Sequence, residues 1–381
     1  MVLPLLLLWG TASTSLAQIR ENTDNEYHFK VDKKMDATPV QNQARTGTCW
    51  SFASLSFLES EMIREGKDPV NLSEMYLVRR AYNQKALKYV RMHGTINFGE
   101  GGELHDVLKL APKYGLVPES VYNGLDYGTQ KHNHGELFAV LDSYVHSVIE
   151  NKNGDITPVW DDAYKKILDT YLGETPKKFK FEGKTYTPEK FFKDRVGINP
   201  DDYIEVTSFT HEPFYKPYVM QIPDNWEWGE AYNVPLADFT QIIEQALENG
   251  YTVGWASDVS DPGFSFKKGL AIVPQKPWAD MSKEEKEKAF TQPVPQRKIT
   301  QAMRQDIYNN YELTDDHAMH IIGLAHDQDN TPYFLVKNSW GTDNEYHGYL
   351  FASEAYVQYK STAIMVNKNA LPKKLREKLG V

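Results

Sequence analysis

The sequence predicts an α+β protein, with a helical first half followed by a β-rich second half. In residues 49–66, Trp50, Ala53 and Phe57 recur at helical spacing, and Ser73 is placed as the N-cap of a second helix. Beyond residue 250, short runs of β-branched and aromatic residues are separated by turn-forming residues, which is typical of strands. The predicted strands cover residues 251–256, 269–273, 317–325, 333–336 and 348–352.

The order of these patterns divides the chain into segments. We predict a signal peptide over residues 1–17, a loosely held arm over 18–36, the helical half over 37–125, a helical insertion over 126–200, the β-rich half over 201–366 and a C-terminal helix over 367–381. The turn-forming run 327–332 should join two strands as a hairpin, and the charged segment 280–298 should be a loop or a surface helix. Clefts form readily between two such halves, so the functional site is expected there.

Composition restricts the possible functions. The 381 residues contain 42 Lys and Arg against 52 Asp and Glu, a net charge of −10, so a nucleic-acid partner is not expected. The one cysteine, Cys49, excludes intramolecular disulfides and Cys-rich metal sites. His132 and His134 lack a neighbouring ligand set at suitable spacing, so we interpret them as part of a solvated loop and predict no metal.

The first residues indicate export. An apolar run is followed by small and polar residues up to Ala17, which is the order of a secretory signal peptide, although no Lys or Arg precedes the run. The run is too short to cross a bilayer, so no stable membrane anchor is predicted. We therefore expect cleavage near Ala17 and a periplasmic or secreted protein, with a buried N-terminal strand as the alternative.

Cys49 lies where a loop becomes a helix. Unpaired backbone N–H groups at a helix N-terminus favour the thiolate, which would make this a reactive cysteine, whereas from position alone a small inert core residue is the more common case. Gln43 lies across a turn-like segment from Cys49, and its amide could return beside the sulfur to stabilise an oxyanion.

Three motifs, taken in order, carry a family resemblance. The segment from Gln41 to Ala53, with Gln43, Gly47 and Cys49-Trp50-Ser51, resembles the nucleophile segment of papain-like cysteine peptidases. Asp316-His317-Ala318 and Lys337-Asn338-Ser339-Trp340-Gly341 resemble the other two signatures of that family. Further likeness at 225–226, 233–236 and 248–253 is to the bleomycin hydrolase and aminopeptidase C branch, so a papain-like fold with helical insertions is expected.

The resemblance implies a role for each matched residue. Cys49 would be the nucleophile, His317 the base, Asn338 the residue that orients the imidazole, and Gln43 an oxyanion donor together with the Cys49 backbone N–H. On an extended strand His317 and His320 point to opposite faces, so only one of them can face the thiol.

The resemblance also implies substrate contacts, on shorter matches than those of the catalytic residues. Gly101 and Gly102 resemble the glycine pair along which a peptide backbone pairs, Trp340 resembles the tryptophan that shields the imidazole from water, and Asp316 precedes the histidine in its motif. We assign these four residues to substrate binding. No cofactor is implied, peptides are the expected partners, and the resemblance makes a homo-oligomer possible.

The type of peptidase is left open at this point. Aminopeptidases of the branch share a C-terminal tail that enters the cleft and reads the amino end of the substrate, whereas this sequence stops at Val381 just after a short basic helix. An aminopeptidase, a tail-less endopeptidase of the same fold and a non-catalytic peptide-binding module are therefore the three alternatives. The complete set of Cys, His, Asn and Gln argues against the third, because a binder needs no such set.

Overall fold

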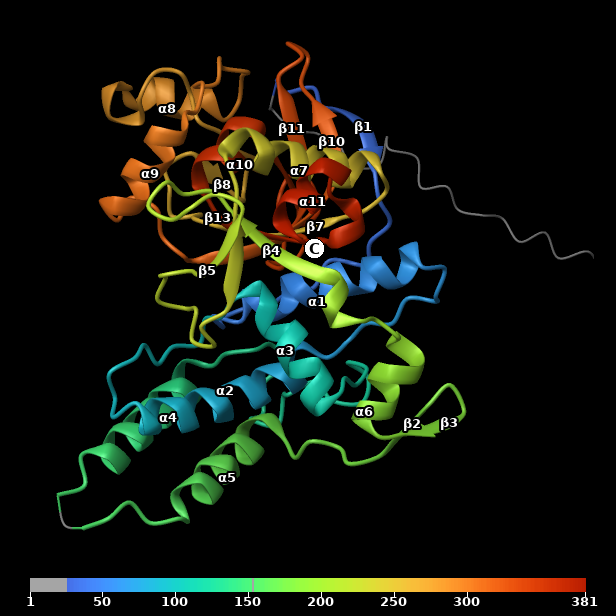
Figure 1. The fold of residues 1–381 in the computed structure, drawn as a ribbon, viewed down its shortest axis with the longest axis vertical. Helices are drawn as coiled ribbons and strands as arrows, with labels where there is room; N and C mark the ends of the chain where they lie inside the picture. Colours follow the sequence, from blue (N-terminus) through green and yellow to red (C-terminus); the bar gives the residue numbers. More distant parts are fainter. Residues whose placement is uncertain (1–25, 153) are drawn as a thin grey trace, which may run out of the picture.

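The computed structural model describes residues 26–152 and 154–381. In the view of Figure 1 a layer of helices lies below and a large sheet with its covering helices lies above, with α1 and α3 between them. The predicted α+β architecture is thus confirmed. The expected signal peptide, residues 1–17, lies outside the described residues.

Three helices build the helical half: α1 (Cys49–Arg64), α2 (Glu74–Arg91) and α3 (Leu104–Tyr114). Helix α2 begins where predicted, because the Ser73 hydroxyl accepts a hydrogen bond from the Tyr76 backbone N–H at 3.1 Å. Glu103 caps α3 in a capping box with Asp106, whose carboxylate accepts from the Glu103 backbone N–H at 3.0 Å.

Helix α1 is the central element of the molecule. Every residue from 50 to 62 is buried, which is the pattern of a helix covered on all sides. It packs against β10 of the sheet on one side and against α2 and α3 on the other. Ala256 and Ala318 from the β-rich half belong to the same apolar cluster, so a continuous core fixes the two halves to each other.

The predicted helical insertion extends the helical half away from the sheet. Its elements are α4 (Gly135–Ile149), α5 (Trp160–Leu172), β2 (Phe179–Phe181), β3 (Lys184–Tyr186), α6 (Pro188–Phe191) and the π-helical turn η2 (Phe192–Val196). Helices α4 and α5 pack on α2. The small β2–β3 hairpin was not anticipated.

A mixed sheet forms the β-rich half. The strands follow the order β5-β6-β4-β13-β7-β10-β11-β12-β9-β8, and β1 pairs with β10 off this path. Their bounds are β1 (Lys30–Lys34), β4 (Tyr203–Thr207), β5 (Lys216–Val219), β6 (Glu230–Asn233), β7 (Val253–Ser257), β8 (Phe264–Ser265), β9 (Leu270–Ala271), β10 (His317–His326), β11 (Pro332–Lys337), β12 (Tyr349–Ser353) and β13 (Ser361–Asn367).

The strands nearest the site match the prediction well. The hairpin of β10 and β11 turns through Asp327, whose carboxylate accepts from the backbone N–H groups of Asp329 and Thr331, both at 2.9 Å. His317 lies opposite Ser257 of β7, and His320 lies between Gly254 of β7 and Lys337 of β11, on the strand that packs against α1.

Helices cover the sheet and its borders. They are α7 (Leu236–Glu248), α8 (Lys283–Ala289), α9 (Gln301–Asn309), α10 (Glu354–Lys360) and α11 (Lys373–Leu379), with short 3-10 turns η3 (Pro200–Asp202), η4 (Trp278–Asp280) and η5 (Lys368–Ala370). Helix α8 is the predicted surface helix. The predicted C-terminal helix is α11, whose Leu375 and Leu379 pack with Val381 against the core of the β-rich half.

One expectation needs correction. The arm predicted over residues 18–36 is not loosely held in its described part, because residues 30–34 form β1 and pair with the far end of β10. Tyr27 is fully buried beneath this strand, and its hydroxyl donates to the Ala289 carbonyl at 3.0 Å. Across the described part of the chain, no helix combines the length and apolarity that crossing a bilayer requires.

Candidate active site

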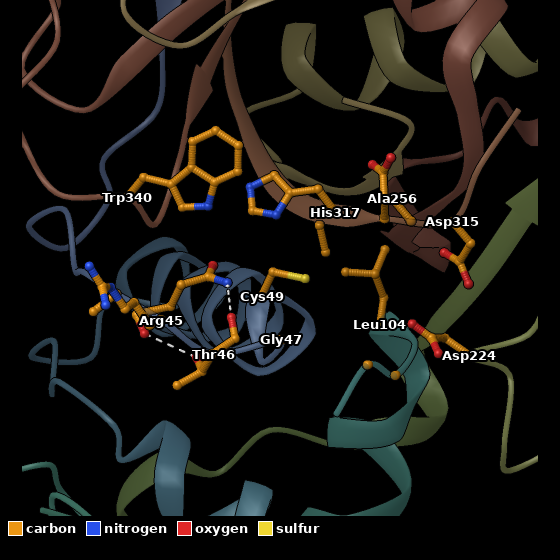
Figure 2. A pocket seen from close by; sticks show the side chains of 16 residues that line it. Arg45, Thr46, Gly47, Cys49, Leu104, Asp224, Ala256, Asp315, His317 and Trp340 are labelled. Atoms are coloured by element: carbon orange, nitrogen blue, oxygen red, sulfur yellow. Dashed lines mark hydrogen bonds between the residues drawn. The ribbon is translucent and has the colours of Figure 1, made fainter. Parts of the chain in front are cut away.

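A pocket of about 420 Å³ opens between the two halves, next to the start of α1 (Figure 2). It contains Cys49, His317, Gln43, Gly101, Gly102, Trp340 and Asp316, which are seven of the eight residues selected from the sequence. The eighth, Asn338, lies just behind this lining and contacts His317. The structure therefore brings together residues that are scattered over almost three hundred positions of the chain.

The nucleophile candidate is the first residue of α1. Cys49 follows the N-cap residue Thr48 and is partly exposed in the pocket. Its backbone N–H has no acceptor within the helix, because the first N–H groups of any helix lack one. This N–H is therefore free to donate to a ligand in the pocket.

His317 opens β10 and is held by Asn338, which follows β11. His317 Nε2 donates to the Asn338 side-chain oxygen at 2.7 Å, and the same oxygen accepts from the Ser339 backbone N–H at 2.7 Å. Both side chains are almost fully buried. The bond places the ring proton on Nε2 and leaves Nδ1 as the nitrogen that accepts a proton.

The two histidines of β10 point as strand parity requires. His320 is buried on the opposite face from His317, where its Nδ1 lies 2.9 Å from the Ser56 hydroxyl of α1. It does not line the pocket. The geometry thus selects His317 over His320 as the base.

Trp340 covers the imidazole. Its ring lies 4.5 Å from that of His317, centre to centre, and is inclined by 36°. Phe264 and Phe266 pack edge-on against the far part of the indole. This contact fits the shielding role implied by the resemblance, and Trp340 also reaches the pocket wall.

Gln43 is clamped between two segments. Its Nε2 donates to the Thr46 carbonyl at 2.7 Å, and its Oε1 accepts from the Ser339 hydroxyl at 2.7 Å. The Gln43 backbone N–H also donates to the Ser339 carbonyl, at 2.9 Å. Because an amide nitrogen carries two hydrogens, one remains for a group bound beside Cys49.

Charge in this pocket is costly when it appears alone. Burial raises the pKa of the Cys49 thiol to about 12, and the carboxylates of Asp315 and Asp224 push it in the same direction. Burial lowers the pKa of His317 to about 4, against the opposing effect of its bond to Asn338. Transfer of the proton from sulfur to Nδ1 creates a thiolate and an imidazolium together, so the pocket gains no net charge.

This finding corrects the simplest expectation for the thiol. The position at a helix start, beside a histidine, predicted a thiol pKa below the ordinary value. Burial first, and then the carboxylates of Asp315 and Asp224, raise the thiol pKa instead, so the thiolate depends on proton transfer to His317.

The glycine pair has no room for side chains. A Cβ placed at Gly101 would lie 1.7 Å from the Asp224 carboxylate, and one at Gly102 would lie 2.5 Å from the Asp106 carboxylate. Both glycines border the pocket. Asp316 also borders it, but its oxygens accept from the Val259 backbone N–H and the Thr314 hydroxyl, each at 2.7 Å, and so fix the start of β10.

Several site residues carry no recognisable sequence signal. The Glu100 carboxylate accepts from the Gly47 backbone N–H at 2.8 Å and so holds the loop before Cys49. Asp224 and Asp315 line the pocket but belong to no motif. In the sequence, the only hint for Glu100 was its position next to the glycine pair. The only hint for Asp315 was its position two residues before His317.

The interpretation of His132 and His134 as a solvated loop was wrong. Both are buried, and their segment pairs with the nucleophile loop, since the Arg45 backbone N–H donates to the His132 carbonyl and the His134 N–H donates to the Arg45 carbonyl, both at 3.1 Å. The His134 ring lies 2.9 Å from the Tyr82 hydroxyl. Within residues 26–152 and 154–381, neither belongs to a group of three potential metal ligands.

Comparisons with known proteins agree with this geometry. The Peptidase C1-like family model matches residues 81–380, which include His317 and Asn338. Aminopeptidase C of Lactococcus lactis subsp. cremoris is 25% identical over 379 residues, covering 90% of this chain and 83% of the relative. Bleomycin hydrolase of Rattus norvegicus is 24% identical over 406 residues, covering 92% and 85%.

A solved structure supports the fold. The crystal structure of PepW from Lactobacillus rhamnosis HN001 matches with a TM-score of 0.68 and 22% identity, over 92% of this chain and 84% of that one. Since the family model covers well over half of the chain and the expected cleft is present, the chain belongs to the Peptidase C1-like family of papain-like cysteine peptidases.

Proposed function

We propose that the protein is a thiol aminopeptidase in which Cys49, His317, Asn338 and Gln43 hydrolyse peptide bonds. The observation that carries this proposal is the arrangement of the chain's single cysteine in one pocket with an imidazole whose Nε2 is held by Asn338 at 2.7 Å. The names of the curated relatives, aminopeptidase C and bleomycin hydrolase, support the same class of reaction.

Acylation follows from the atoms in the pocket. The Cys49 thiolate attacks the carbonyl carbon while His317 Nδ1 holds the proton taken from sulfur. The carbonyl oxygen becomes an oxyanion, for which the Cys49 backbone N–H and the second hydrogen of Gln43 Nε2 are the donors. The proton on Nδ1 then passes to the leaving nitrogen, the C–N bond breaks, and an acyl-thioester of Cys49 remains.

Deacylation uses the same groups in the reverse order. Water attacks the thioester carbonyl and gives a proton to Nδ1, the C–S bond breaks, and the proton returns to sulfur. Asn338 fixes the imidazole through both steps, and Trp340 keeps bulk water from the His317–Asn338 bond.

The order of product release tests the aminopeptidase assignment. A peptide with a free amino terminus should lose single residues in sequence from that end, as followed by mass spectrometry over time. Initial cleavage at an internal bond would favour the tail-less endopeptidase. Binding of peptides without any hydrolysis, by protein with an unmodified Cys49, would favour the non-catalytic binding module.

We further infer export from the sequence pattern of residues 1–17. Amino-terminal sequencing of the protein from its native host should then give Gln18 as the first residue. A mature chain that still begins at Met1 would contradict export by this signal.

A further inference from the structure

One end of the active-site pocket is acidic. Figure 2 shows Asp224 and Asp315 on the side of Leu104 that lies away from His317 and Trp340. Both residues border the pocket, and Glu103, which is 3% exposed, lies beneath Asp315. We refer to Asp224, Asp315 and Glu103 as the acidic end.

Two oxygens of these carboxyl groups lack the hydrogen-bond partners that buried acids normally have. The carboxyls of Glu103 and Asp315 lie against each other, and the Asp315 carboxyl accepts a hydrogen bond from the Asp224 backbone N–H. Within the described part of the chain, Glu103 Oε1 and Asp315 Oδ2 are buried without a hydrogen-bond donor. Asp224 accepts from the Asn97 amide at 3.0 Å, and among the described residues none of the three acids forms an ion pair.

The nearest cation is committed elsewhere. Lys85 is 3% exposed, and its ammonium donates to the carbonyls of Gly99, at 2.9 Å, and Gly101. It thereby fixes the glycine pair, and its charge offsets only part of the effect of burial on the pKa of Asp224. Burial accordingly raises the pKa of Asp315 to about 7 and also raises that of Asp224.

The acidic end borders the part of the pocket where the peptide substrate would lie. The Asp224 carboxylate lies directly against Gly101, so it borders the path along which a peptide backbone would pair with the glycines. Asp315 is two residues before His317 in the sequence and borders the same pocket. Leu104, Ala256 and Ala318 line the pocket with these acids and leave the carboxylates as the polar groups at that end.

We propose that Asp224 and Asp315 form a subsite for a cationic group of the peptide substrate, either its terminal ammonium or a Lys or Arg side chain. The proposal rests on the proposed function and gives it a substrate class. A substrate cation would supply a donor to the unpartnered Asp315 Oδ2 and to the Asp224 carboxylate, since charge-assisted hydrogen bonds are stronger than neutral ones. Glu103 would act as a positioning residue for Asp315.

Binding measurements on a catalytically inactive variant test the subsite independently of catalysis. Four peptides of one sequence combine a free or acetylated amino terminus with Lys or its uncharged analogue norleucine as the first residue, which precedes the scissile bond. Their affinities for the full chain carrying Cys49→Ala, measured by calorimetry, should fall roughly 10–100-fold when the relevant cation is removed. A loss of affinity on acetylation identifies the terminal ammonium as the ligand. A loss of affinity on replacing Lys by norleucine identifies the side chain.

Two Asp→Asn variants test whether the two carboxylates are responsible for the affinity for cationic peptides. In the Cys49→Ala background, Asp224→Asn and Asp315→Asn should each weaken binding of the cationic peptide at least tenfold and change binding of the acetylated norleucine peptide less than about threefold. Asp162→Asn, which removes an exposed acid from α5, is the matched control for net charge and should change neither. Thermal unfolding of each variant shows that it is folded.

Two results would overturn the subsite: equal affinities for all four peptides, or a cation preference that survives in both Asn variants. Turnover of the same peptides by the unmodified enzyme tests the proposed peptidase function independently of the subsite. A chain that binds with the predicted preference but hydrolyses none of the peptides would refute the peptidase and leave the subsite standing.

Discussion

His317 Nε2 lies 2.7 Å from the side-chain oxygen of Asn338, and this bond determines which imidazole nitrogen faces the thiol pocket. The partners come from neighbouring strands of one hairpin, so the pairing of β10 with β11 fixes their separation. The catalytic tautomer is thus a consequence of strand register.

Asn338→Ala should therefore weaken catalysis without removing it. Loss of the bond lets the imidazole rotate and change tautomer, and we expect kcat to fall roughly 10–100-fold with little change in KM. Steady-state kinetics on a single peptide substrate would measure this. An unchanged kcat would mean that Asn338 has only a structural role.

The two histidines of β10 should give opposite results. His317→Ala should lower kcat by roughly 10²–10⁴, since the base is lost. His320→Ala removes the contact with Ser56 and should cost about 1–3 kcal/mol of unfolding free energy while retaining most activity. Kinetics together with urea unfolding distinguish the two, and a reversed pattern would place the base at His320.

Gln43→Ala should lower kcat by roughly 10²–10³, the usual effect of losing one oxyanion donor. Ser339→Ala is the matched milder change, because it removes only the hydroxyl that holds Gln43 Oε1 at 2.7 Å. It should reduce kcat by less than Gln43→Ala does. Equal activity of Gln43→Ala and the unmodified enzyme would exclude Gln43 from the oxyanion site.

The pH dependence of thiol alkylation tests the ion pair. With His317 present, the thiol proton moves to Nδ1, so the rate of reaction with iodoacetamide should rise with pH through an inflection below the ordinary thiol pKa of about 8.5. In His317→Ala the proton has no such acceptor, and burial, which raises the thiol pKa to about 12, should move the inflection well above 8.5. An unmodified enzyme with its inflection at or above 8.5 would indicate an inert buried thiol.

Local patterns were sufficient to predict the elements around the site. The Ser73 cap, the helix starting at Cys49 and the alternation along β10 are each determined by neighbours in the sequence, and motif order then identified Cys49, His317 and Asn338. Strand parity showed that only one of His317 and His320 could face the thiol, and the motif selected His317.

What could not be predicted depends on distant contacts. Strand β1 is a short polar segment that is ordered only because it pairs with β10, nearly three hundred residues later. The burial of His134 arises because its segment pairs with Arg45, far away in the chain. Likewise, Asp315 and Asp224 add to the effect of burial in raising the pKa of the Cys49 thiol, and no local pattern places either carboxylate near it.

Because Cys49 is the only cysteine, labelling it tests the central claim most directly. Iodoacetamide incorporation, counted by intact mass, should track the loss of peptidase activity one for one, and activity should reach zero when one label is bound per chain. A fully labelled chain that still hydrolyses peptides at the unmodified rate would contradict a mechanism based on the Cys49 thiolate.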